Sequence, residues 1–341
     1  MKYSSRFFLY APLGLFLALA VGAGANWWIV ASALSRKLDS LNGRPAMPGV
    51  TLGFSSKRVS GFPFNLDVVF KNVRIEVETG HGPSSWTSQD FAIHALAYGR
   101  EQMIFEAAGR QLLTWTDLER RHRVLPFEVG EWHASSIADE RGLERFDMDL
   151  IGFGSPALTM ARAQLHVRLD PRRGTVDIAG EADAVRPKTT SPSLFGDTIA
   201  QARLVATAVP SRSFDAIRAA NAGWESALET WRKAGGRLHI DDLELSWNRL
   251  GAIGKGNLSL DVAHSVEGFI DFKVSHVQWL LDAASRSHVR GSADRGVAAA
   301  LLIRAAKAGN SEAGLLGANL IFRDGLVSVG EVAATTEEPL Y

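Results

Sequence analysis

Long stretches of this chain alternate apolar and polar residues with a period of two. Between Gly61 and Gly80, every second position is apolar over one run, which comprises Phe62, Phe64, Leu66, Val68 and Phe70. Successive side chains of a β-strand point to opposite faces of a sheet, so this spacing predicts strands with one apolar face. Because the pattern recurs along most of the chain, it indicates a largely antiparallel sheet.

The alternation in this segment changes phase at Lys71-Asn72, where the next apolar set begins at Val73, three positions after Phe70. Without an extra residue in the strand, this shift would turn the second half of the strand toward the other face. The sequence therefore predicts a bent strand or a hairpin here. The same offset recurs at Asp241-Asp242, which we interpret as a turn rather than a carboxylate pair for acid-base chemistry.

Turn signals separate other alternating segments. Residues 170–174 (DPRRG) lie between two apolar strand patterns, and Asp324-Gly325 is a favoured two-residue hairpin turn. Apolar residues spaced by three and four from Phe214 to Trp231 predict one long amphipathic helix, and a weaker helical pattern covers residues 292–307. The predicted fold is mainly antiparallel α+β, with bent hairpins, a curved sheet and one long amphipathic helix.

The N-terminus is apolar and carries no Asp, Glu, Lys or Arg from Phe7 to Ser35, which exceeds the roughly 20 residues that cross a bilayer as a helix. Lys2 and Arg6 precede it. Cleavage of a signal peptide between Ala25 and Asn26 is the alternative. The retained anchor is favoured because apolar residues continue through residues 27–30.

The 341-residue chain therefore divides into three parts. Residues 1–38 form a transmembrane anchor or signal, residues 39–50 a linker rich in Gly and Pro, and residues 51–341 a β-rich body. The body is long enough for two sub-regions, of about 51–210 and 211–341.

Composition and motifs exclude several classes of function. Lys+Arg and Asp+Glu both total 37, so no net charge favours nucleic acid. The absence of cysteine excludes disulfides, thiolate metal ligands and cysteine nucleophiles. The nine histidines lack metal-ligand spacing, and residues 152–157 (GFGSPA) lack the second glycine of a hydrolase elbow. We expect no catalytic residue, metal or cofactor; a hydrolase would require a triad that one sequence cannot reveal.

Several segments together resemble a known family. The apolar N-terminus, the SGFPF segment (residues 60–64) and the closing DGLVSVG (residues 324–330) resemble an uncharacterised bacterial envelope family, the domain of unknown function numbered 2125. More distantly, residues 254–282 resemble the C-terminal region of AsmA-like envelope proteins. That resemblance implies a bacterial inner-membrane anchor and a periplasmic β-rich body with an apolar trough linked to lipid transport or envelope homeostasis. Secretion into the periplasm after signal cleavage is the alternative location.

The candidate ligand site is an apolar face made of Phe62, Phe64, Leu66, Val68 and Phe70, together with Trp224 and Trp231 of the expected helix. One hypothesis is that this face binds or shields a hydrophobic ligand, with lipid as the expected class. The other is that the face packs against the helix in a sealed core, in which case the protein is a structural or partner-binding envelope scaffold without a ligand. Apolar residues serve both purposes, so the sequence leaves both hypotheses open.

Overall fold

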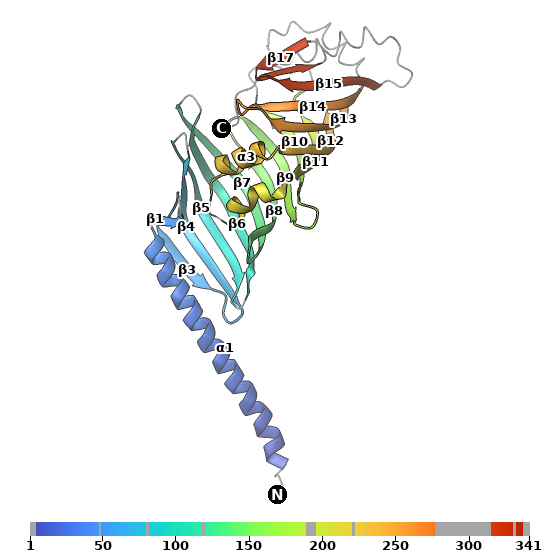
Figure 1. Cartoon of the computed structure of the whole chain (residues 1–341). Coiled ribbons are helices and arrows are strands. Elements are labelled where there is room, and N and C mark those ends of the chain that lie inside the picture. The colour runs from blue at the N-terminus through green and yellow to red at the C-terminus, as the bar shows by residue number, and fades with distance from the viewer. Residues whose placement is uncertain are drawn as a thin grey trace.

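The computed structural model describes residues 5–336, apart from residues 48, 80–81, 98, 118–119, 189–195, 220–221, 277–314 and 330–331. A 37-residue helix, α1 (Ser5–Leu41), leads into a single 17-stranded sheet that forms an open, curved body (Figure 1). The strands are β1 (Arg44–Met47), β2 (Val50–Gly53), β3 (Ser56–Ser60), β4 (Asn65–Thr79), β5 (Gly82–Leu96), β6 (Gly99–Thr116), β7 (His122–Asp139), β8 (Gly142–Gly154), β9 (Leu158–Asp170), β10 (Thr175–Pro187), β11 (Ile199–Val209), β12 (Arg237–Trp247), β13 (Leu250–Leu260), β14 (Val266–Ser275), β15 (Leu315–Arg323), β16 (Leu326–Val329) and β17 (Val332–Thr336).

The sheet is an antiparallel meander. From β4 to β17 each strand pairs with the next strand along the chain, while β2 and β3 both pair with the free edge of β4, and β1 pairs with β2. The predicted turns at residues 170–174 and at Asp324-Gly325 join β9 to β10 and β15 to β16. The prediction of a mainly antiparallel α+β fold with a curved sheet is confirmed.

Both phase changes in the sequence are bulges within continuous strands, not hairpins. In β4 the irregularity is at Asn72, which has a φ of 50° and is skipped in the pairing with β5, and Phe70 and Val73 on its two sides lie in the same buried cluster. The register of the next two strand pairs is interrupted beside it, between Ser88 and Asp90 and at Gly109. Because the bulges lie side by side on neighbouring strands, they bend the sheet along one line.

The helical segment is shorter than predicted. A 3₁₀ turn, η1 (Ser211–Phe214), is followed by two α-helices, α2 (Asp215–Arg218) and α3 (Trp224–Lys233). The prediction of one long helix is wrong because Gly223, the residue before α3, has extended backbone angles (φ −82°, ψ 170°) that end any helix entering it. The weaker helix expected at residues 292–307 lies outside the described residues.

The C-terminal part of α1 belongs to the body. Ala31 is buried, and Leu34 and Leu38 pack against the buried cluster on β4, β5 and β6. The Lys57 ammonium on β3 donates to the Ser35 hydroxyl (2.7 Å) and pairs with Asp39 (3.1 Å). Residues 39–50 are therefore not a plain linker, because α1 extends to Leu41, β1 follows and β2 starts at Val50.

Candidate functional site

The sheet has one continuous apolar face. Register pairs place side chains from successive strands next to one another on the same face. The central row crosses twelve strands, from β4 to β15, through Val68, Ile93, Phe105, Ala134, Met148, Leu165, Gly180, Leu204, Leu243, Gly254, Phe272 and Ala318. At about 4.8 Å between strands, this row is roughly 50 Å long. We call the surface made by this row and its apolar neighbours the apolar face.

The two ends of the apolar face are buried, but its middle is not. Val68, Phe70 and Phe91 form a buried cluster at one end, where α1 covers them, and Ala206, Ile240 and Ile270 form a second cluster on β11–β14. Between them, the apolar side chains of β8, β9 and β10 are half-buried; these include Phe146, Met148, Leu150, Leu165, Val167 and Ile178. A helix is about 10 Å wide and covers roughly two or three strands, so α1 cannot shield a row that crosses twelve.

Small residues hollow the face beside this half-buried region. Ala163, Ala182 and Ala202 are register neighbours on β9, β10 and β11, and Gly180 lies one row away. A cavity of about 470 Å³ opens over Gly180, Ala182 and Ala202, with Leu204 and Phe272 among its other lining residues. That volume is in the range of small-molecule and cofactor sites.

The structure divides the strand residues predicted for the site into two groups. Leu66, Val68 and Phe70 lie on the apolar face and are buried. Phe62 and Phe64 do not continue this alternation, because they lie in a turn ahead of β4 and are 62 % and 60 % exposed. The turn is closed by the Asn65 N–H, which donates to the Gly61 carbonyl (2.8 Å).

The two tryptophans predicted to line the site are also separated. Trp231 is buried at the hairpin ends of the sheet, where its indole N–H donates to the Val209 carbonyl (2.8 Å). Trp224 is 59 % exposed at the start of α3. Neither is brought onto Phe70, which packs instead against Phe54 and Phe91.

Sequence reasoning missed the half-buried residues of β8, β9 and β10 as part of the site. Their signal is the same period-two alternation, visible within residues 158–170 as Leu165, Val167 and Leu169. It predicts an apolar face on each strand. It does not predict that this stretch of the face is left partly uncovered, which depends on where the helices end.

The helices α2 and α3 lie at the hairpin ends of the central strands. The Arg218 guanidinium donates to the Leu143 carbonyl (2.7 Å) at the start of β8, and the Gly142 backbone lies close to that of Arg218. At the other end, Glu229 is 3.5 Å from His264, in the turn between β13 and β14. The two helices therefore lie along this rim of the sheet, and the apolar side chains in the middle of the face stay half-buried.

The opposite face carries the charges. The Arg162 guanidinium makes two hydrogen bonds to Asp149 (2.8 and 2.7 Å) and holds the pKa of that carboxyl below its usual range. Burial opposes ionisation of Asp147, but hydrogen bonds from His166 (2.7 Å) and Arg145 outweigh it and lower the pKa of that carboxyl. Ion pairs of this kind keep this face solvated, so the two faces differ sharply in polarity.

The described part of the chain contains no metal-binding cluster, and the adjacent carboxylates Asp241 and Asp242 are held by separate partners. No group of three or more His, Asp or Glu among those residues is placed to hold a metal ion. Asp241 and Asp242 lie at the bulge of β12, where Asp241 accepts from the Thr207 hydroxyl (3.1 Å) and Asp242 from Arg203 (3.3 Å). Each carboxylate thus has its own cross-strand partner, which is the arrangement of structural ion pairs rather than of a shared acid-base pair.

These features define a class of protein: a long apolar N-terminal helix joined to an open antiparallel sheet with one partly uncovered apolar face. α1 is the one helix in the described residues that is long and apolar enough to cross a membrane, as a single-pass anchor or as part of a signal sequence. The chain belongs to the family described as an uncharacterized protein conserved in bacteria (DUF2125), whose model matches residues 27–336. The search of curated proteins finds no match for the chain.

Proposed function

We propose that this protein is a single-pass protein of the bacterial inner membrane whose periplasmic body binds the acyl chains of a lipid on its apolar face. The observation that carries the proposal is the half-buried middle of that face, on β8, β9 and β10, beside the cavity of about 470 Å³. Shielding apolar groups from water contributes about 0.8 kcal/mol per methylene, so an acyl chain gains from lying there. We propose that the activity is binding or shielding, without catalysis, in envelope homeostasis.

The exposure of α1 supports the membrane part of the proposal. From Tyr10 to Ala23 the described side chains are exposed, although most of them are apolar. A helix that is apolar on all sides and unpaired with protein is suited to a hydrocarbon environment. The apolar residues from Trp27 onward carry less weight, because several of them pack on the body.

Two neighbouring positions on β10 provide a test. Ile178 lies on the apolar face and Ala179 on the opposite face, because adjacent strand residues point to opposite sides. A benzophenone amino acid at each position, in the full-length protein in living cells, would be activated by light, and the adducts identified by intact mass spectrometry. We expect a phospholipid adduct from position 178 and none from 179, and the intact mass also shows whether the N-terminal segment is retained.

A lipid adduct from both positions, or from neither, would contradict the proposal. Absence of lipid adducts together with crosslinks from position 178 to another protein would instead support the alternative function, a partner-binding scaffold. A lipid adduct at position 178 in a protein whose N-terminal segment has been cleaved would support lipid binding and contradict the proposed membrane anchor.

A further inference from the structure

The turn at residues 61–64 exposes two aromatic rings next to α1. Phe62 and Phe64 are 62 % and 60 % exposed, which is unusual for two large apolar side chains in one short turn. The neighbouring hairpin adds to this surface: the Ala97 N–H donates to the Phe64 carbonyl (2.8 Å), and Leu96 is 41 % exposed. The result is a small apolar patch at one rim of the sheet.

Contacts with α1 fix the level of this patch along the helix. The Phe62 ring meets the Trp27 ring edge-on, with centroids 5.4 Å apart. The Trp27 indole N–H donates to the Asn65 carbonyl (2.7 Å), directly after the turn. A Cβ added to Gly24 would lie 3.5 Å from the Phe62 ring, so the turn faces one short section of α1, between Gly24 and Trp27.

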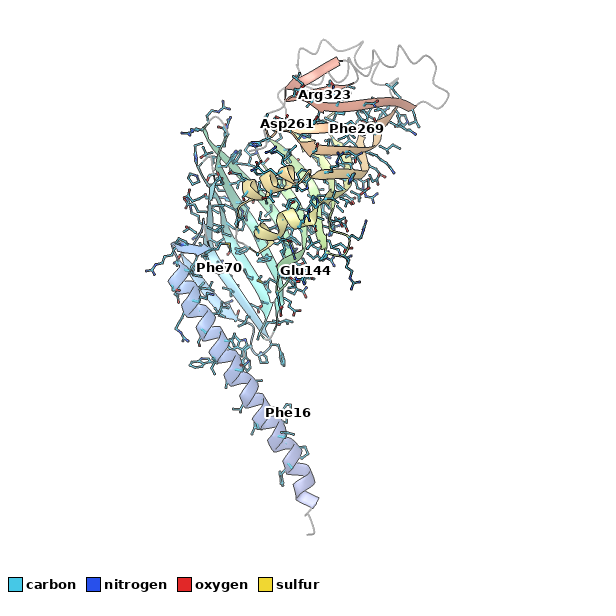
Figure 2. The ribbon with its side chains drawn as sticks, viewed as in Figure 1. Phe16, Phe70, Glu144, Asp261, Phe269 and Arg323 are labelled. Atoms are coloured by element: carbon cyan, nitrogen blue, oxygen red, sulfur yellow. The ribbon has the colours of Figure 1, made fainter. Side chains whose placement is uncertain are left out.

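The section of α1 that precedes Gly24 is about as long as the hydrocarbon core of a bilayer is thick. Between Ser5 and Ala23 the helix rises about 27 Å at 1.5 Å per residue, close to the roughly 30 Å of a hydrocarbon core. This free section, which carries Phe16, extends away from the body (Figure 2). If it spans the hydrocarbon core, residues 24–28 lie at the membrane surface, where aromatic side chains concentrate. Trp28 there is 67 % exposed, on the same helix turn as Trp27.

We infer that the turn at residues 61–64 is a second membrane contact, in which Phe62 and Phe64 insert into the phospholipid interface on the side of the body. The exposed turn meets α1 at Trp27, whose ring contacts that of Phe62. Such a contact would fix the tilt of the body and hold this rim of the apolar face against the bilayer. The inference rests on α1 spanning the membrane, which is part of the function proposed above, and is independent of whether lipid binds to the apolar face.

The chain contains no cysteine, so single positions can be spin-labelled without removing native thiols. The test uses the full-length protein in vesicles of phosphatidylethanolamine and phosphatidylglycerol, with single substitutions Phe16→Cys, Phe64→Cys and Val262→Cys. Phe16 reports on the free part of α1, and Val262, 86 % exposed in the turn between β13 and β14, is the matched control for an exposed apolar residue away from α1. Accessibility to oxygen, which concentrates in lipid, is compared with accessibility to a water-soluble nickel chelate.

We expect the oxygen-to-nickel ratio to be severalfold higher at positions 16 and 64 than at position 262. A ratio at position 64 equal to that at 262, with position 16 in lipid, would overturn the inference and leave the anchor intact. A low ratio at position 16 would reject the anchor and the inference together. A label at position 64 that is shielded from both reagents would indicate a protein contact, such as a second copy of the chain, and would also overturn it.

Discussion

Trp224 and Trp231 lie seven positions apart on the same short helix, yet one is exposed and the other is buried. Seven residues are about two helical turns, so both point to a similar side of α3. Trp224 is the first residue of α3 and is exposed, whereas Trp231 lies against Phe214 and Gly236. A spacing rule assigns a side of the helix and cannot locate its ends relative to the sheet.

This contrast predicts different costs of truncation. Trp231→Ala should destabilise the body by about 3–5 kcal/mol, because it leaves a cavity and an unpaired Val209 carbonyl. Trp224→Ala, the matched control on the same helix, should change stability by no more than about 0.5 kcal/mol. Chemical unfolding of the full-length protein in mild detergent, followed by near-ultraviolet circular dichroism, measures both. Equal losses for the two variants would show that α3 packs differently from the arrangement described here.

Phe62 and Phe64 show that period-two alternation does not locate the start of a strand. Their spacing agrees with that of Leu66, Val68 and Phe70, so the sequence assigns all five to one face. Gly61 has a φ of +100°, and a Cβ there would lie 2.7 Å from the Asn65 carbonyl oxygen, so the chain turns tightly before β4 begins. Alternation assigns a residue to one face of the sheet only if that residue lies within a hydrogen-bonded strand.

At the scale of the element, the bulges show what a phase change can and cannot predict. A slip of one residue at Lys71-Asn72 fits a hairpin as well as a bulge, because both restore the apolar residues to one side. The choice is made by β5, which pairs with β4 along its whole length, from Asn65 to Thr79. That pairing partner is not visible in the local sequence of β4.

The bulge in β4 depends on a residue that tolerates a left-handed backbone. Asn72 has a φ of 50°, and its side-chain amide donates to the Ser55 hydroxyl (3.1 Å). Asn72→Val should therefore cost about 1–2 kcal/mol, since a β-branched residue is strained in this region. Asn72→Gly relieves the backbone and loses the same hydrogen bond, so it should be the milder change. Thermal unfolding of both variants tests this; if Gly is as damaging as Val, the hydrogen bond rather than the backbone holds the bulge.

At the scale of the whole molecule, the sequence predicts that the sheet has an apolar face, but it does not predict which part of that face is covered by helices. The strands from β4 to β15 follow one another in the sheet in chain order, and their alternation and several of their turns can be recognised in the sequence. A meander is therefore predictable. Which part of the face is shielded depends on two lengths, those of α1 and of the α2–α3 segment. α1 contributes Leu34 and Leu38 only to the β4–β6 end, and α2 meets the middle strands at the start of β8, through the hydrogen bond from Arg218 to the Leu143 carbonyl.

The hollow beside the middle strands lies over small residues of the apolar face, which include Ala182 and Ala202. Ala182 and Ala202, which are register neighbours, line a space that a bulky residue could occupy without displacing backbone. In a sealed core such a residue would be overpacked and destabilising, typically by about 1–3 kcal/mol. Over an open trough it would fill space otherwise available to a ligand.

Ala182→Trp therefore distinguishes the two arrangements. We expect the variant to keep its thermal unfolding temperature and to lose most co-purifying lipid, because the indole occupies the hollow of the apolar face. Ala179→Trp, on the opposite face of the same strand, is the control and should retain the lipid of the unchanged protein. Native mass spectrometry of protein extracted in mild detergent measures lipid occupancy, and a melting curve on the same samples measures stability. A destabilised Ala182→Trp without lipid, beside an equally lipid-free Ala179→Trp, would mean that this face belongs to a closed core, and the lipid-binding proposal would have to be abandoned.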